Sequence, residues 1–186
     1  SVGGVAAHGL AAIDLRTGRA VPVPDFGQFS VTALHAIGDV VIAATSPPGA
    51  GPSTVHAFSA STAAVYPWSL GLDSNVLTFT STARKLFGGG YFSTVEGQPR
   101  PGLFAIDLAT AALAPESQGI LGTVSALGAS QGRLYAFGTN AAGGPGMPTV
   151  TFDADTLSPL PFAPAPPPGN VHGFGFGPGR VLTAGS

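Results

Sequence analysis

The sequence contains no cysteine, and only 9% of its 186 residues are charged. Without cysteine there is no disulfide framework, no thiolate nucleophile and no thiolate-bound zinc. Seven basic residues against nine acidic ones give a net charge of −2, which argues against a nucleic-acid partner. No run of 18 apolar residues occurs, so no membrane span is predicted. The N-terminal segment SVGGVAAHGL lacks the basic start and long apolar run of an intact signal peptide.

The abundant residues are small, turn-forming or apolar. There are 28 glycines and 18 prolines, and 44% of the residues are hydrophobic. A disordered chain would be poorer in apolar residues and richer in charge. The composition therefore predicts a folded, turn-rich, all-β protein.

The chain repeats itself about every 47 residues. One apolar column is occupied by valine in every copy, at spacings of 45, 48 and 47 residues: Val31, Val76, Val124 and Val171. A second column carries Asp, Ser, Asp and Asp, each followed three residues later by Thr: Asp14, Ser59, Asp107 and Asp153. These columns divide the chain into the units 30–74, 75–122 and 123–169, and a fourth made of 170–186 joined with 1–29.

Each unit contains four short runs of 4–7 residues, separated by Gly, Pro, Ser or Asp. This pattern is typical of short β-strands joined by turns. In one unit the runs lie at about 75–80, 84–90, 102–107 and 112–115. The segment 103–114 taken alone could be an alanine-rich helix, but its aligned copies contain Gly18 and Pro159. We therefore predict two strands joined by a turn there, and no helix longer than one turn elsewhere.

The Asp-x-x-Thr motif recurs in the turn between the third and fourth strands. An Asp side chain accepts hydrogen bonds from backbone N–H groups two or three residues further on, so Asp14, Asp107 and Asp153 are predicted turn formers. The alternative is a ring of calcium-binding or catalytic carboxylates. The serine at position 59 and the fixed spacing favour the turn.

Four antiparallel strands in each 47-residue unit predict a β-propeller of four blades. A solenoid of hairpins is the structural alternative. Glycines such as Gly88 and Gly89 would allow close backbone approach near the propeller axis. We predict that 181–185 pairs with 9–14 in one blade and closes the ring, which would hide both sheet edges. The alternatives are an open array cut from a longer parent and a ring assembled from more than one chain.

The segment 87–115, FGGGYFSTVEGQPRPGLFAIDLATAALAP, resembles a β-propeller repeat of large secreted bacterial proteins. That repeat, a domain of unknown function close to the delta-sixty type, has an apolar pair, Gly-Gly, an aromatic residue and a Gly-Gln-x-Arg loop. The similarity is strong in 75–121, clear in 1–24 and weak in the other units. Kelch repeats are more distantly similar, through 134–165. The resemblance implies a propeller in a secreted or extracytoplasmic protein, and it implies no catalytic residues.

Four residues are candidate binding residues. His35 and His172 fall in the first strand of their units, which lines the channel of a propeller, where a histidine could bind a small ligand or hydrogen-bond ordered water. Arg100 could bind a carboxylate or phosphate bidentately, or have a structural role at the surface or between blades. Trp68 could stack on a sugar ring or pack against the next blade.

No catalytic residue, metal site or cofactor is predicted. The sequence lacks a Gly-x-Ser-x-Gly motif, and the four histidines lack the spacings of helix-borne metal ligands. We expect a non-enzymatic scaffold, adhesion or interaction module of a larger secreted bacterial protein. The alternatives are a lectin-like propeller that binds carbohydrate or a small ligand and, less favoured, a propeller hydrolase or lyase. Expected partners are a protein, a cell-surface glycan, a second copy or neighbouring parts of a parent chain.

Overall fold

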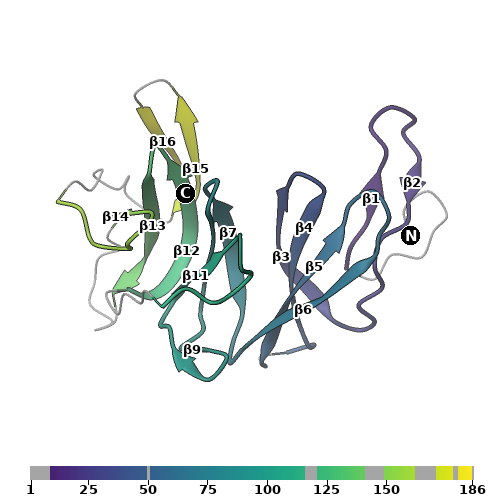
Figure 1. The fold of residues 1–186 in the computed structure, drawn as a ribbon, viewed down its shortest axis with the longest axis horizontal. Helices are drawn as coiled ribbons and strands as arrows, with labels where there is room; N and C mark the ends of the chain where they lie inside the picture. The colour runs from purple at the N-terminus through teal and green to yellow at the C-terminus, as the bar shows by residue number, and fades with distance from the viewer. Residues whose placement is uncertain are drawn as a thin grey trace. The chain divides into compact units, whose positions relative to one another are not determined.

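The computed structural model describes residues 9–49, 51–115, 121–140, 149–161, 171–177 and 180–185. These residues form strands and turns without any helix, so the predicted all-β class is confirmed (Figure 1). In the part of the chain that is described, no helix is long and apolar enough to span a membrane. The chain forms two compact units, Ser1–Asn75 and Val76–Ser186.

The first unit contains a four-stranded antiparallel meander in which each strand pairs with the next along the chain. Its strands are β3 (Ser30–Ile37), β4 (Val40–Ser46), β5 (Ser53–Ser59) and β6 (Val65–Leu72). They correspond to the four strands predicted for 30–74. Two short strands, β1 (Ala12–Ile13) and β2 (Ala20–Val21), form a separate antiparallel pair.

The second unit repeats the same arrangement in shorter form. One sheet consists of β7 (Val76–Ser81), β8 (Lys85–Gly90) and β11 (Leu103–Asp107), and the next of β12 (Leu121–Ser130), β13 (Arg133–Asn140) and β14 (Thr149–Asp153). In each sheet a single bridge marks the place of the fourth strand: Ile106 to Leu113 and Phe152 to Pro159. The segment 103–114 is therefore not a helix, as predicted, but the second strand expected at 112–115 is reduced to a single bridge at Leu113.

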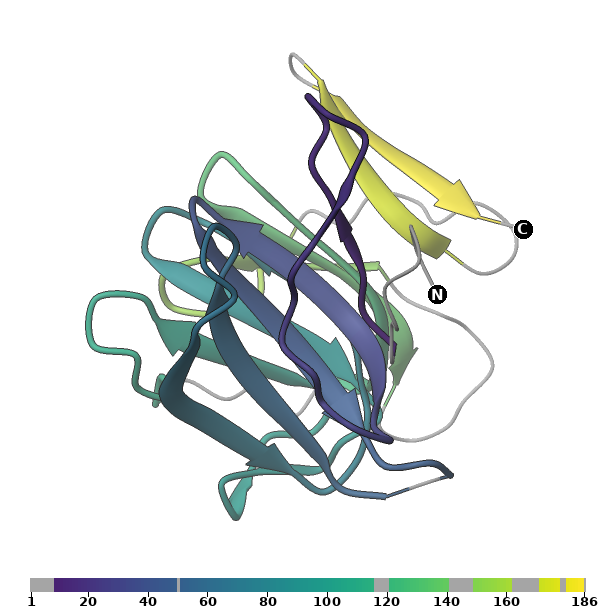
Figure 2. The ribbon, with the colours of Figure 1, turned by 90° about the vertical axis from the view of Figure 1, so that its right-hand side faces the viewer.

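Two smaller pairs of strands complete the second unit. β15 (Val171–Gly177) and β16 (Arg180–Gly185) form a two-stranded antiparallel sheet, drawn in yellow in Figure 2. β9 (Thr94–Val95) and β10 (Gln98–Pro99) pair in the connection between β8 and β11.

The turn after the third strand has one geometry in all four copies. Its fifth residue donates its amide N–H to the carbonyl oxygen of the first, at 2.7–2.9 Å. That fifth residue has a positive φ in every copy: Gly18 (68°), Ala63 (60°), Ala111 (57°) and Leu157 (54°). Only glycine adopts this conformation without steric cost, so three of the four turns hold a mildly strained residue. The fixed hydrogen bonds explain why the Asp-to-Thr spacing does not vary.

The core of the second unit lies between successive sheets. Phe87 and Leu103 from the first of them pack against Val124, Leu134 and Phe152 from the next, and all five side chains are buried. Large apolar side chains at alternate positions of two facing sheets produce this arrangement.

A glycine permits the closest approach between these two sheets. A Cβ atom on Gly89 of β8 would lie 2.6 Å from Cγ1 of Val124 on β12. Aromatic side chains contact the next sheet: the Tyr135 ring on β13 lies 5.6 Å from the Phe176 ring on β15. The close approach expected of the glycine-rich strand ends is thus present at Gly89.

Candidate functional site

The repeated aspartates accept hydrogen bonds from their own turns. Oδ1 of Asp107 accepts the backbone N–H groups of Ala109 and Thr110, both at 3.0 Å, and the Thr110 hydroxyl at 3.1 Å. Asp14 and Asp153 accept the corresponding pair of N–H groups. The N–H of the turn threonine is the largest of the effects that hold the pKa of each carboxyl below its ordinary value. The prediction that these three aspartates form turns is confirmed.

Arg100 is buried, with 7% of its surface exposed. Its Nη1 donates to the carbonyl oxygen of Pro99 at 2.8 Å, and its Nη2 donates to Oε1 of Gln98 at 3.1 Å and to the carbonyl oxygen of Ala114 at 3.2 Å. Its Nε is buried without a hydrogen-bond partner among the described residues. The guanidinium therefore ties the β9–β10 connection to the segment that follows β11.

The other three predicted binding residues lie apart within the described structure. His35 on β3 is half-buried, and burial lowers its pKa. Trp68, also half-buried, lies on β6 at the far side of the same four-stranded sheet. Three strand spacings place these residues about 14 Å apart, so they form no common site. His172 lies in β15, and its side chain is outside the described residues.

A third histidine has a ring contact that the sequence pattern does not reveal. The imidazole of His56 on β5 stacks on the ring of Phe26, with centroids 5.1 Å apart and planes 24° apart. Burial lowers its pKa. No group of three or more His, Asp or Glu side chains in the described part of the chain is arranged to hold a metal ion.

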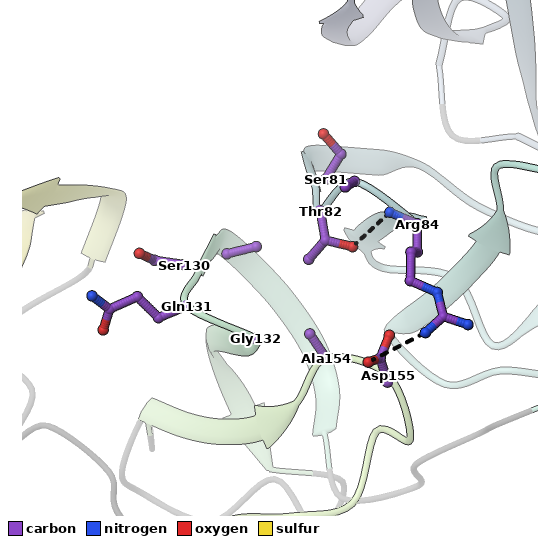
Figure 3. A pocket seen from close by; sticks show the side chains of 10 residues that line it. Ser81, Thr82, Arg84, Ser130, Gln131, Gly132, Ala154 and Asp155 are labelled. Carbon is purple, nitrogen blue, oxygen red and sulfur yellow. Dashed lines mark hydrogen bonds and ion pairs between the residues drawn. The ribbon is translucent and has the colours of Figure 1, made fainter.

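A hollow of about 380 Å³ lies inside the second unit, where the ends of two neighbouring sheets meet (Figure 3). It is lined by the turn between β7 and β8, the turn between β12 and β13, and the turn after β14. Arg84 and Asp155 lie on one side and Ser130 and Gln131 on the other. Nη1 of Arg84 is 3.8 Å from Oδ2 of Asp155, and both side chains are largely exposed.

No motif in the sequence predicts this hollow. The position of Arg84 is occupied by Asp39 and Gly132 in the aligned units, and that of Asp155 by Ala109 and Arg16. Neither column has a fixed residue, so comparison of the repeats does not point to this hollow.

The comparisons with known proteins concern the fold alone. No protein-family model and no curated protein matches the sequence. Among solved structures, the chain resembles the computationally designed Ika8 protein, with a TM-score of 0.61 and 16% identity over 91% of this chain and 47% of that one. It also resembles the computationally designed Ika4 protein, with a TM-score of 0.59 and 17% identity over 88% of this chain and 90% of that one. The chain thus spans about half the length of Ika8.

Proposed function

We propose that the chain is a β-propeller whose repeats are its blades, and that it serves as a non-enzymatic scaffold or interaction module of a larger secreted protein. The observation that carries this proposal is the use made of its charged side chains. Asp14, Asp107 and Asp153 hold their own turns, and Arg100 bonds to carbonyl oxygens nearby in the chain. Charged side chains that hydrogen-bond the protein's own backbone favour a scaffold over a catalyst.

The strand register supports the propeller part of the proposal. The first residue of the repeated turn lies opposite the first residue of the second strand in each sheet: Ser59 opposite Val40, Asp107 opposite Lys85, and Asp153 opposite Arg133. A shared register, together with sheets packed face to face in series, is what blades require.

The proposal includes closure of the ring, and the same register specifies how. It would place Asp14 opposite Arg180 and Ala12 opposite Leu182, with the segment 9–14 as the third strand beside β15 and β16. The alternatives remain an open array within a longer parent and a ring formed by more than one chain.

A pair of engineered cysteines tests closure directly, because the chain contains no cysteine of its own. Ala12→Cys combined with Leu182→Cys should give an intramolecular disulfide on oxidation, seen as a monomer with altered mobility on a non-reducing gel. The matched control, Ala12→Cys with Thr183→Cys, displaces one sulfur to the other face of the sheet and should stay reduced. Disulfide-linked dimers, or equal oxidation of both variants, would contradict intramolecular closure.

The functional part is tested with hydrolase and lyase substrates. We expect the purified chain to turn over no glycoside, uronide, ester or peptide substrate faster than a heat-denatured control. Turnover that is lost on replacing a single titratable residue such as His35 would contradict a scaffold role.

A second candidate function, binding of a carbohydrate or another small ligand, is favoured by the hollow beside Arg84 and Asp155. It is compatible with a scaffold role, because a propeller can hold a ligand on one face without catalysing a reaction.

A further inference from the structure

The hollow between the two hairpin ends combines one ion pair with small neutral residues. Arg84 and Asp155 supply a positive and a negative group on one side. Ala83, Ala129 and Ala154 supply small apolar surfaces. A concave site with a mostly apolar lining and a few polar groups is the usual form of a small-ligand site, and about 380 Å³ is within the usual range of volumes.

The Arg84–Asp155 ion pair is exposed and has no direct hydrogen bond between its two groups. At 3.8 Å the nearest nitrogen and oxygen are too far apart for a direct hydrogen bond, and the side chains are 76% and 60% exposed. In the described structure the guanidinium of Arg84 makes no hydrogen bond to another side chain. Donor groups of Arg84 and acceptor groups of Asp155 are therefore available on the same side of the hollow.

Arg84 and Asp155 favour a ligand group that can bind both of them. A carboxylate would have to compete with Asp155 for Arg84, and an ammonium would have to compete with Arg84 for Asp155. In either case only one of the two exposed side chains would bind the ligand, and the other would be left to water. A hydroxyl can engage both, because it can accept from Arg84 and donate to Asp155 at the same time.

Thr82 adds a further group at the edge of the hollow. Its Oγ1 accepts the backbone N–H groups of Arg84 and Lys85, at 3.3 and 3.1 Å. These bonds fix the turn from which the Arg84 side chain extends. The hydroxyl proton of Thr82 can still be donated to a ligand.

We propose that this hollow binds a neutral polyhydroxylated ligand of one or two sugar rings, with one hydroxyl bridging Arg84 and Asp155. The alanine side chains would contact the C–H surface of the ring. The site lies within the second unit, so the inference deepens the second candidate function and does not depend on ring closure.

The test is a titration of the full chain followed by ¹H–¹⁵N correlation spectra, with glucose, galactose and maltose as separate probes. We expect saturable shifts confined to the amides of 81–84, 129–132 and 154–155, with a dissociation constant on the order of 1 mM for at least one probe. Glucuronate and glucosamine, which carry a charge, should bind more weakly. Tighter binding of a charged sugar would overturn the choice of a neutral ligand.

Substitutions locate the site. Arg84→Gln and Asp155→Asn should each weaken binding about tenfold, because each removes a charge-assisted hydrogen bond. Arg133→Gln is the matched control: it removes an exposed arginine that does not line the hollow, and it should leave binding unchanged. Absence of saturable shifts, or equal affinities for all three variants, would overturn the site while leaving the closure test and the scaffold proposal untouched.

Discussion

The carboxylate of Asp39 accepts the backbone N–H of Ser61 at 2.9 Å, 22 residues further along the chain. The same carboxylate accepts the hydroxyl of Ser59 at 2.6 Å. Ser59 occupies the position that is aspartate in the other three repeats, and its own hydroxyl oxygen accepts the N–H of Thr62 but not that of Ser61. Asp39 therefore supplies, from the turn between β3 and β4, the carboxylate that this repeat lacks. This turn keeps the geometry of the others although Ser59 replaces their aspartate.

We expect Asp39→Ala to lower the melting temperature by a few degrees, as much as Asp107→Ala does, because each change removes the acceptor of a turn N–H. Thermal unfolding followed by circular dichroism measures both. Asp155→Ala is the matched control, since that carboxylate makes only an exposed ion pair, and its effect should be near zero. If Asp39→Ala were as silent as the control, the borrowed carboxylate would have no structural role.

A second prediction concerns the positive φ of the turn. Ala111 has a φ of 57° at a position where the first repeat has Gly18. Since alanine pays a steric cost in this conformation and glycine does not, Ala111→Gly should raise the free energy of unfolding by up to about 1 kcal/mol. Urea unfolding measures the change.

The control for that substitution lies two residues earlier. Ala109 has no positive φ, so Ala109→Gly adds freedom only to the unfolded chain and should lower the free energy of unfolding by about 0.5–1 kcal/mol. Equal effects of the two substitutions would show that backbone strain is not what distinguishes position 111.

A third prediction tests the close approach within the sheet of β12 and β13. A Cβ atom at Gly138 would overlap the carbonyl oxygen of Thr123, a backbone atom that cannot rotate away. Gly138→Ala should therefore lower the free energy of unfolding by about 1–3 kcal/mol. Gly175→Ala is the control, because its Cβ would lie an ordinary 3.7 Å from Leu182, and it should cause no loss. A tolerated Gly138→Ala would contradict the pairing of these strands.

The strands and turns could be predicted from the sequence because local interactions determine them. The segment 103–114 shows this well. Its alanine content favours a helix, but Asp107 and Thr110 close a turn whose hydrogen bonds span only a few residues. Comparison with the aligned copies predicts this turn without knowledge of the tertiary structure, because each copy of a repeat adopts the same local structure.

The polar contacts between sheets could not be predicted in this way. Lys85 is buried, with 7% of its surface exposed, and its ammonium donates to the carbonyl oxygen of Asp155, 70 residues further along the chain. The hollow beside Arg84 depends on the distance between two turns from different repeats. Periodicity specifies each sheet, but it does not specify which side chains meet between sheets.

A fourth prediction is that stability falls on acidification in two steps. The upper step arises from His35 and His56, because burial lowers the pKa of both imidazoles below the ordinary value of 6.5. The unfolded chain then binds protons more readily than the folded one, so stability is full above about pH 6.5 and falls as the pH drops through the folded pKa values. His56→Phe should flatten this step, because it keeps a ring beside Phe26 and removes a titrating group.

The lower step arises from the turn carboxylates. Donated N–H and hydroxyl groups hold the pKa values of Asp14, Asp39, Asp107 and Asp153 below the ordinary value of 3.8. Their contribution is therefore present above about pH 4 and is lost as the pH falls through the lowered values. Melting temperatures recorded from pH 7 to pH 2 should decline in both ranges, and Asp107→Asn should reduce the decline only in the lower one. A melting temperature that stays constant or rises below pH 4 would mean that these carboxylates are no better stabilised in the folded protein than in the unfolded chain.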